Sequence, residues 1–270
     1  MLELGLAGKR ALVAGAGHRP PRPGIGRAAA LGLAEAGAKV ACVDLDGDRA
    51  GAVAEEIRAN GGEAVVVVAD LRDAAGAAAA VAGAVDAFGG LDVCIDIIGE
   101  ARWGSFLDFA EDDWEWTLGT NLRQVFLMFQ AAARQMRSQG TGGSLAAVAS
   151  VDGLRCAPNH VAYGAAKAGI VNMVRTVSEE LGPLGIRANA VAPGMVWGPT
   201  DEQPERPPGD TVTPLVRPMA DDIARALIFF SSDMARTVTG QTLAVDGGAS
   251  STAVFSDAYR AVGDMLAQRS

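Results

Sequence analysis

A tyrosine and a lysine four residues apart are the first side chains in this sequence that could do chemistry together. The stretch YGAAK places Tyr163 and Lys167 so that, on a helix, both project from one face. An ammonium near a phenol stabilises the phenolate and lowers the phenol pKa toward the range of a general acid or base. The pair indicates proton transfer, although this spacing alone is a weak signal.

Two more polar residues fall where they could join this pair. Ser150 follows the apolar run LAAVA, thirteen residues before Tyr163, and is expected at the carboxyl edge of a sheet. Asn121, in the stretch LGTNLRQVF, is expected near the start of another helix. Taken singly, Ser150 is explained equally well as a turn residue, Asn121 as a helix cap and Tyr163 as half-buried core. Their joint order favours a catalytic site.

The elements that must position these side chains alternate along the whole chain. Short continuous apolar runs indicate strands buried on both faces, which is typical of a parallel sheet. Ala-rich stretches between them, such as 25–37 and 161–181, have the spacing and length of helices. The expected strands are 9–15, 39–44, 63–70, 91–98, 143–150, 186–193 and 241–248. This alternation predicts one α/β domain over residues 1–270, a doubly wound Rossmann-type parallel sheet of about seven strands with helices on both faces.

Composition limits the classes of function. The net charge of −9 argues against binding nucleic acid or an anionic membrane through bulk electrostatics. Cys42, Cys94 and Cys156 lie in separate apolar contexts, so we interpret them as buried thiols of a reducing compartment and expect neither disulfides nor a metal site. No apolar run reaches the ~18 residues of a membrane span, and the first residues do not resemble a signal peptide. We therefore expect a cytoplasmic protein with a small-molecule substrate.

The order of these motifs resembles the short-chain dehydrogenase/reductase family over roughly residues 5–250. After a glycine-rich turn and the residues above come NAVAPG (189–194) and VTGQTLAVDGG (238–248), and the combination is highly specific although each piece is not. The resemblance implies a nicotinamide cofactor and hydride transfer to or from an alcohol/ketone substrate. It identifies the chain as an NAD(P)-dependent oxidoreductase, an alcohol dehydrogenase or ketone reductase.

The resemblance also implies a role for each of the four catalytic candidates. Tyr163 would give or take the hydroxyl proton of the substrate. Lys167 would hold the nicotinamide ribose and lower the Tyr163 pKa. Ser150 would hydrogen-bond the substrate oxygen as its charge changes. Asn121 would anchor a water relay that returns protons to Lys167.

The glycine-rich turn carries an unusual insert, HRPPRP (18–23), between Gly15 and Gly24. Prolines donate no backbone N–H to a phosphate. The stretch Gly24-Ile25-Gly26 nevertheless opens an expected helix, whose N-terminus favours an anion. We therefore expect the insert to bulge outward and leave the pyrophosphate site usable.

Opposing charges bear on the choice of cofactor. Asp44 ends the second expected strand, where a carboxylate accepts hydrogen bonds from a ribose diol and repels a 2′-phosphate. Arg19 and Arg22, with His18, could neutralise a 2′-phosphate, or they could be solvated loop residues. We expect NAD, with NADP as the alternative.

Further cofactor contacts follow from the resemblance, and two departures from the family pattern accompany them. The sequence Asp96-Ile97-Ile98-Gly99 replaces the usual Asn-Asn-Ala-Gly, and a buried Asp96 would need backbone donors or a raised pKa. The threonine that usually follows the Pro-Gly motif is missing at its position. The expected cofactor-binding residues are Gly15, Arg19, Gly24, Ile25, Gly26, Asp44, Asp70, Leu71, Gly99, Tyr163, Lys167, Pro193, Gly194 and Val196.

The substrate is poorly encoded in the sequence. Residues that flank the catalytic segments are expected to form the cleft wall, namely Trp103, Asp152, Arg155, His160, Met195 and Trp197. Their mixture favours a medium-sized, partly apolar alcohol or ketone, and the acidity of the chain disfavours an acidic carrier protein. The proline- and charge-rich stretch 198–215 is interpreted as a substrate lid or, alternatively, a surface loop, and 252–270 as a helical extension.

The apolar faces of the helices expected at 121–137 and 161–181 agree with the tetramers that the family commonly forms. We therefore expect a homotetramer, although packing on the sheet explains part of this hydrophobicity. Two other functions stay open. One is a non-redox, cofactor-binding regulatory protein on the same scaffold, and the other is a lyase or epimerase that uses its cofactor transiently.

Overall fold

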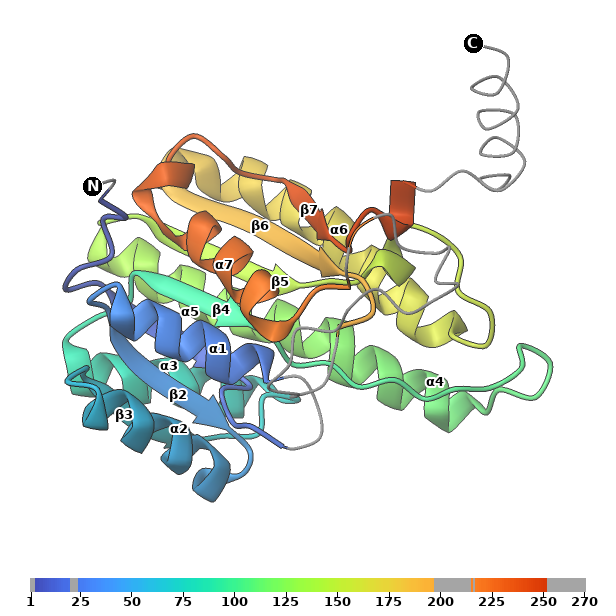
Figure 1. Cartoon of the computed structure of the whole chain (residues 1–270), viewed down its shortest axis with the longest axis horizontal. Helices are drawn as coiled ribbons and strands as arrows, with labels where there is room; N and C mark the ends of the chain where they lie inside the picture. The colour runs from blue at the N-terminus through green and yellow to red at the C-terminus, as the bar shows by residue number, and fades with distance from the viewer. Residues whose placement is uncertain (1–2, 20–23, 197–214, 216, 252–270) are drawn as a thin grey trace, which may run out of the picture.

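The sheet at the centre of the molecule has seven strands, and every neighbouring pair in it is parallel. The computed structural model describes residues 3–19, 24–196, 215 and 217–251. The strand order is β3-β2-β1-β4-β5-β6-β7, with helices on both faces (Figure 1). The expected fold class, a doubly wound Rossmann-type sheet, is confirmed.

All seven expected strands are present, several of them shorter at one or both ends than expected. They are β1 (Arg10–Ala14), β2 (Lys39–Asp44), β3 (Ala64–Val68), β4 (Val93–Asp96), β5 (Gly143–Val148), β6 (Ile186–Pro193) and β7 (Thr242–Val245). The α-helices are α1 (Ile25–Glu35), α2 (Gly47–Ala59), α3 (Ala74–Phe88), α4 (Glu111–Leu118), α5 (Gln124–Gln139), α6 (Val161–Leu181) and α7 (Ala220–Ser231). The helix expected at 161–181 has these bounds in the structure.

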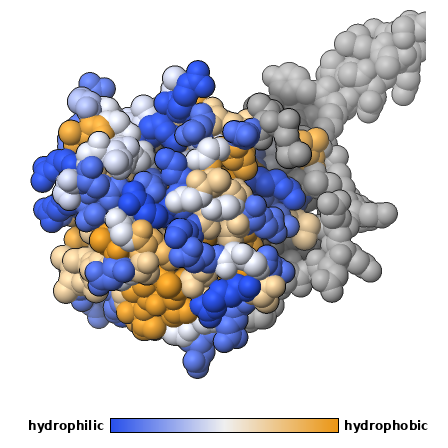
Figure 2. Space-filling model, turned by 90° about the vertical axis from the view of Figure 1, so that its left-hand side faces the viewer, coloured by the Kyte–Doolittle hydropathy of each residue, from blue (hydrophilic) through white to orange (hydrophobic). Residues whose placement is uncertain are grey.

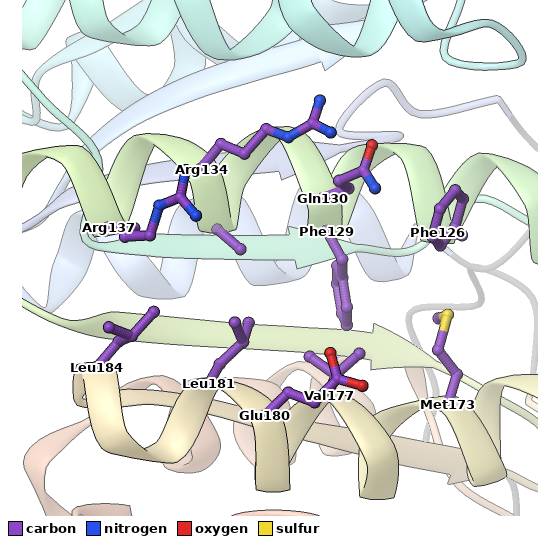
Figure 3. A pocket seen from close by; sticks show the side chains of 11 residues that line it. Phe126, Phe129, Gln130, Arg134, Arg137, Met173, Val177, Glu180, Leu181 and Leu184 are labelled. Atoms are coloured by element: carbon purple, nitrogen blue, oxygen red, sulfur yellow. The ribbon is translucent and has the colours of Figure 1, made fainter.

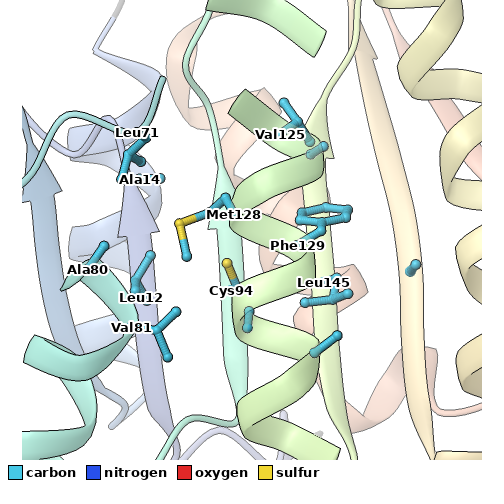
Figure 4. Close-up of a cluster of buried hydrophobic side chains, with 14 of the residues drawn as sticks. Leu12, Ala14, Leu71, Ala80, Val81, Cys94, Val125, Met128, Phe129 and Leu145 are labelled. Atoms are coloured by element: carbon cyan, nitrogen blue, oxygen red, sulfur yellow. The ribbon is translucent and has the colours of Figure 1, made fainter. Parts of the chain in front are cut away.

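The continuous apolar strands are buried because both faces of the sheet are covered. Side chains alternate along a strand, so Leu12 and Ala14 of β1 pack on one face while Ala11 and Val13 pack on the other. The first face meets α3, α5 and α6, and Figure 4 shows Met128 and Phe129 of α5 lying over it. The second face meets α1, α2 and α7. Burial on both faces is the reason that the strands read as unbroken hydrophobic runs.

The order of the strands determines where a ligand can bind. The chain adds β2 and β3 on one side of β1 and then places β4 on the other side. In such sheets ligands bind beyond the carboxyl ends of the strands at this change of direction. The amino ends of the strands lie at the opposite end of the molecule, where Figure 2 shows mostly hydrophilic side chains with apolar patches between them. Among the described residues, no helix is both long and apolar enough to cross a membrane.

The sequence suggested that Asn121 lies near the start of a helix, and the structure places it elsewhere. The helices α4 and α5 run into each other through a π-helical turn, Gly119–Arg123, and Asn121 sits inside that turn. A π-turn widens the helix and frees a carbonyl from its regular partner, and such turns are frequent at functional sites. The sequence pattern could not reveal this because one extra residue in a turn leaves helical spacing almost unchanged.

The cysteine interpretation was wrong for one of the three residues. Cys42 and Cys94 are buried, and burial raises the pKa of the Cys42 thiol to about 12. Cys156 is exposed, because it lies in the turns between Ser150 and α6 and not in a strand.

Several expectations fall outside the described residues, namely Arg22 and the proline part of the insert, Trp197, nearly all of the lid at 198–215 and the extension at 252–270.

Candidate active site

A cleft of about 510 Å³ lies at the carboxyl ends of the strands around β1 and β4. Twelve of the expected residues line it: Gly15, Arg19, Ile25, Gly26, Asp44, Gly99, Ser150, Tyr163, Lys167, Pro193, Gly194 and Val196. Sequence reasoning missed nine others, namely Gly17, Leu45, Arg49, Ile97, Ile98, Glu100, Thr120, Val148 and Ala149. Most of the missed residues are neighbours of expected ones, so the cleft extends the predicted site without relocating it.

Steric constraints explain why glycines stand at the start of α1. Gly15 adopts a positive φ of 80°, and a Cβ on Gly26 would lie 1.9 Å from the Gly15 carbonyl oxygen. Gly24 is the N-cap of α1, and it has no side chain that could accept a hydrogen bond from the first turn of this helix. The first N–H groups of such a helix can bind an anion such as a pyrophosphate.

Asp44 is fixed at the end of β2 by backbone donors. Its Oδ2 accepts a hydrogen bond from Gly17 N at 3.1 Å, and its Oδ1 accepts one from Asp46 N at 3.0 Å. Arg49, in the first turn of α2, lines the same part of the cleft and is held by Asp46, with 2.6 Å between Nε and Oδ2. An acidic and a basic group therefore border the cleft side by side. Arg19 also lines the cleft.

Tyr163 and Ser150 come together as the sequence predicted. Ser150 is buried at the carboxyl end of β5, where its Oγ accepts a hydrogen bond from Asp152 N at 3.1 Å. The pKa of Tyr163 is raised to about 12, chiefly by burial and also by the charge of Asp152, while a hydrogen bond with Ser150 acts in the opposite direction. The net shift in the protein alone is upward, because burial outweighs the hydrogen bond with Ser150, and the expected lowering of this pKa by Lys167 stays a prediction.

Lys167 is the largest fully buried side chain of the described residues, with 1% of it exposed. Its Nζ donates a hydrogen bond to Val148 O at 2.8 Å. Burial lowers the pKa of the ammonium to about 8, while the charge of Asp96 acts in the opposite direction. A buried lysine with a pKa close to neutrality is suited to proton exchange.

The turn that follows β4 brings Asn121 to Lys167. Asn121 Nδ2 donates to Glu100 O at 2.7 Å and to Thr117 O at 2.8 Å, and Asn121 Oδ1 accepts from Glu100 N at 3.1 Å. Between them lies Gly99, where a Cβ would stand 2.9 Å from Lys167 Nζ and 3.0 Å from Asn121 Oδ1. Only a glycine leaves room at this position for both side chains.

Three expected substrate residues gather beside Tyr163. The His160 ring stacks on the Tyr163 ring with 4.7 Å between centroids, and the Trp103 ring stacks on the other side of His160 at 3.6 Å. His160 Nδ1 lies 2.7 Å from Asp152 Oδ2, a hydrogen-bond distance. Trp103 is 69% exposed. An aromatic surface with polar edges therefore flanks the catalytic tyrosine candidate.

Other expected residues are placed differently. Asp70 pairs with Arg72, with 2.9 Å between Oδ1 and Nε, and Leu71 is buried in the core, so neither lines the cleft. Arg155 donates to Ala249 O at 3.1 Å, and Met195 is exposed beside Arg217. Their cofactor and substrate contacts stay predictions.

Comparison with known proteins agrees with this geometry. The family described as enoyl-(acyl carrier protein) reductase matches residues 21–250. An L-rhamnose 1-dehydrogenase (NAD(P)(+)) of Azotobacter vinelandii is 40% identical, covering 90% of this chain and 97% of the relative. A 3-oxoacyl-(acyl-carrier-protein) reductase of Staphylococcus aureus is 38% identical, covering 89% and 97%. A crystal structure of a short-chain dehydrogenase/reductase from Burkholderia xenovorans superposes with a TM-score of 0.85 at 36% identity, covering 92% and 98%.

The chain therefore belongs to the short-chain dehydrogenase/reductase family. The expected class, an NAD(P)-dependent oxidoreductase of the alcohol dehydrogenase type, is confirmed. The cleft fits a nicotinamide dinucleotide, because the uncapped start of α1 can bind its pyrophosphate and Asp44 stands where β2 ends.

Proposed function

We propose that the chain interconverts a secondary alcohol and a ketone on a small, polyhydroxylated substrate, with Tyr163 as the general acid–base. The observation that carries this proposal is the convergence of Ser150, Tyr163 and Lys167 in the cleft that Gly15, Gly26 and Asp44 also line. We assign the first three residues to chemistry and the others to the cofactor. Asn121 is assigned to the positioning of the turn beside Lys167.

When bound, the nicotinamide supplies an acceptor or a donor of hydride. In the oxidative direction, Tyr163 Oη accepts the proton of the substrate hydroxyl while the carbinol carbon loses its hydrogen as hydride. Ser150 Oγ donates a hydrogen bond to the same oxygen and holds it at the tyrosine. The ammonium of Lys167 stabilises the phenolate and binds ribose hydroxyls. Reduction follows the same steps in reverse, with Tyr163 returning the proton.

The walls of the site support a hydroxylated substrate. Asp152 and His160 offer polar atoms beside Tyr163, and Trp103 offers an aromatic face of the kind on which sugar rings pack. Relatives named L-rhamnose 1-dehydrogenase and D-threitol dehydrogenase act on such compounds by their names, at 40% and 34% identity. The net charge of −9 disfavours an acidic carrier protein, although one relative is named for such a substrate.

The test begins with the purified protein titrated separately with NADH and NADPH, using tryptophan fluorescence. Turnover is then measured with L-rhamnose, threitol and a 3-oxoacyl thioester, in both directions. We expect oxidation of a sugar or polyol with one cofactor reduced per product formed. Turnover of the thioester alone would replace the substrate assignment, and product without net cofactor reduction would indicate a lyase or epimerase.

We also propose that NAD is the preferred cofactor and that NADP is tolerated. Asp44 can accept hydrogen bonds from an adenosine ribose diol, which favours NAD. Arg49 and Arg19 border the same part of the cleft and can neutralise a 2′-phosphate. The sequence suggested this role for Arg19, whereas Arg49 emerges only from its place beside Asp44.

The homotetramer expected from the sequence stays a proposal, and a groove between α5 and α6 supports it. The groove has a volume of about 210 Å³, and Figure 3 shows side chains of both helices around it. Its apolar residues are Phe126, Phe129, Ala133, Met173, Val177, Leu181 and Leu184. A second copy of the chain would bury this face and remove apolar surface from water.

The cytoplasmic location expected from the sequence also stays a prediction.

A further inference from the structure

Asp96 and Gln124 form a buried polar pair that the proposed chemistry does not use. Asp96 is the last residue of β4, and Gln124 is the first residue of α5, directly after the π-turn that holds Asn121. Asp96 is 1% exposed and Gln124 is fully buried. The residues level with Asp96 on the two neighbouring strands are Ala14 and Ala147, so they offer it no polar side chain.

The hydrogen bonds of this pair are unevenly distributed. Asp96 Oδ1 accepts from Gln124 Nε2 at 3.0 Å and from Ile98 N at 3.1 Å. Within the part of the chain that the structure describes, neither Asp96 Oδ2 nor Gln124 Oε1 has a hydrogen-bond partner, although both atoms are buried. The orientation of the amide is consistent, because Nε2 faces two acceptors, Asp96 Oδ1 and, at 3.5 Å, Ile98 O. Two acceptors without donors therefore belong to side chains that are already joined by one hydrogen bond.

A single proton would satisfy both atoms. A carboxylic acid and a primary amide can form two hydrogen bonds at once, N–H to one carboxyl oxygen and O–H to the amide oxygen. We propose that, below neutral pH, Asp96 carries a proton on Oδ2, uses it to donate a hydrogen bond to Gln124 Oε1, and so acts as a positioning residue for the cofactor cleft. An ionised Asp96 would leave a buried charge on an oxygen without a donor, which is costly.

The surrounding charges agree with this arrangement. Burial raises the pKa of Asp96 to about 6, while its hydrogen bonds and the charge of Lys167 act in the opposite direction. The titratable groups that sense Asp96 among the described residues are Lys167 on α6 and Cys94 on β4 itself. Asp96 forms no ion pair with any described residue, and the Lys167 ammonium donates to Val148 O.

The pair is placed to control the shape of the cleft. Both backbone groups of Ile98 contact it, the N–H through Asp96 Oδ1 and the carbonyl through Gln124 Nε2. Residues 97–100 line the cleft, and Gly99 touches Lys167 and Asn121. Without the proton, Asp96 Oδ2 and Gln124 Oε1 would repel each other, and this repulsion would push the Gln124 amide away from Ile98. The cleft should then bind the cofactor less tightly.

The decisive measurement is infrared difference spectroscopy of the whole protein at about pH 5, which needs no activity. The spectrum of the wild type minus that of Asp96→Asn should contain the carbonyl band of a protonated carboxyl, which shifts on deuteration. Asp92→Asn is the matched control, one residue before the same strand, because Asp92 pairs with Arg10 and its pKa is lowered. Removal of Asp92 should leave the band in place. Absence of the band from the wild type would mean that Asp96 is ionised and would overturn the proposal.

A second measurement keeps the proposal testable if the variants fold poorly. In wild-type protein labelled with ¹³C at aspartate carboxyls, one buried resonance should titrate well above the others, near neutrality. A spectrum in which every carboxyl titrates in the normal acidic range contradicts the proposal.

The positioning role is tested by cofactor binding. Between about pH 5 and pH 7, below the range in which Lys167 titrates, NADH should bind the wild type less tightly as pH rises. Asp96→Ala should weaken binding at pH 5 by roughly tenfold, the equivalent of one lost hydrogen bond to a buried group. Asp96→Asn should recover most of that loss, because an amide also pairs with Gln124, and should show no such pH dependence. Equal pH dependence in wild type and Asp96→Asn would exclude the role even if the cofactor binds well.

Discussion

The ammonium of Lys167 lies 5.4 Å from the centre of the Tyr163 ring, one helical turn further along α6. Burial acts on the two groups in opposite directions, raising the pKa of the tyrosine to about 12 and lowering that of the lysine to about 8. Each group is thereby biased toward its neutral form in the protein alone. Proton exchange at this site depends on what a bound cofactor and substrate add to the charge around them.

Replacement of the phenol is the most direct test of this arrangement. Tyr163→Phe removes only the hydroxyl and keeps the ring that stacks on His160. Turnover should fall by roughly 10²–10⁴-fold, the usual contribution of a general acid or base. Cofactor affinity, measured by fluorescence titration, should change little because the ring stays in place. A variant with more than a tenth of the wild-type rate would remove Tyr163 from the mechanism.

The buried ammonium of Lys167 should lower the free energy of unfolding, although the residue is needed for turnover. At pH 7 its ammonium is buried although its pKa is lowered to about 8, so the folded state bears the cost of that charge. Lys167→Met should abolish turnover and raise the free energy of unfolding by on the order of 1–3 kcal/mol, after the lost hydrogen bond to Val148 O is subtracted.

The stability gained by Lys167→Met should decrease as pH rises. As pH rises through the lowered pKa of about 8, the folded wild type releases the lysine proton before the unfolded chain does, so its stability increases. The advantage of Lys167→Met should therefore shrink in alkaline solution. Denaturant unfolding at about pH 7 and pH 10 measures both values. A variant that is less stable than the wild type at every pH would contradict the argument.

The π-turn should depend on the side chain of Asn121. Asn121→Ala removes three hydrogen bonds from a fully buried residue and leaves Glu100 N, Glu100 O and Thr117 O to find other partners. We expect a loss of about 2–4 kcal/mol in the free energy of unfolding and weaker cofactor binding. Asn60→Ala, at the exposed end of α2, is the control and should change neither by a measurable amount. Equal stability of the two variants would show that the turn does not need this amide.

The sequence predicts the strands of the sheet better than it predicts the segments that connect them. The seven strands were predictable because burial on both faces leaves an unbroken apolar run with few competing interpretations. Tyr163, Lys167 and Ser150 were predictable because the strand end and the helical spacing fix their positions. Asp44 was predictable for the same reason, as the residue that ends β2.

The remaining features depend on contacts between segments far apart in the chain. The raised pKa of Tyr163 results from burial and from the charge of Asp152, which sequence spacing does not encode. Arg49 is one of several arginines in the sequence and becomes relevant only through its position beside Asp44. The need for donors around a buried Asp96 was predictable, but its partner Gln124 lies 28 residues away and carries no local signal.

The choice of cofactor should respond to substitutions at Asp44 and Arg49. Asp44→Asn removes the negative charge that repels a 2′-phosphate, so NADPH should bind about tenfold more tightly relative to NADH. Arg49→Gln should have the opposite effect by removing a cation from the cleft border. Separate titrations with the two reduced cofactors give both ratios. Arg58→Gln, near the other end of α2 and outside the cleft, is the control, and an equal effect of both arginine variants would point to general electrostatics.

The groove between α5 and α6 should determine the oligomeric state. Phe126 is 47% exposed at its edge, and a charge there would have to be buried if a second copy covers the groove. Phe126→Asp should therefore shift the protein from a tetramer to a smaller species in light scattering at micromolar concentration. Val68→Asp, an equally drastic change on the edge strand β3 and away from this groove, should leave the mass unchanged. If the wild type is a monomer, or if Phe126→Asp keeps the full mass, the apolar face of α5 and α6 is not an interface between subunits.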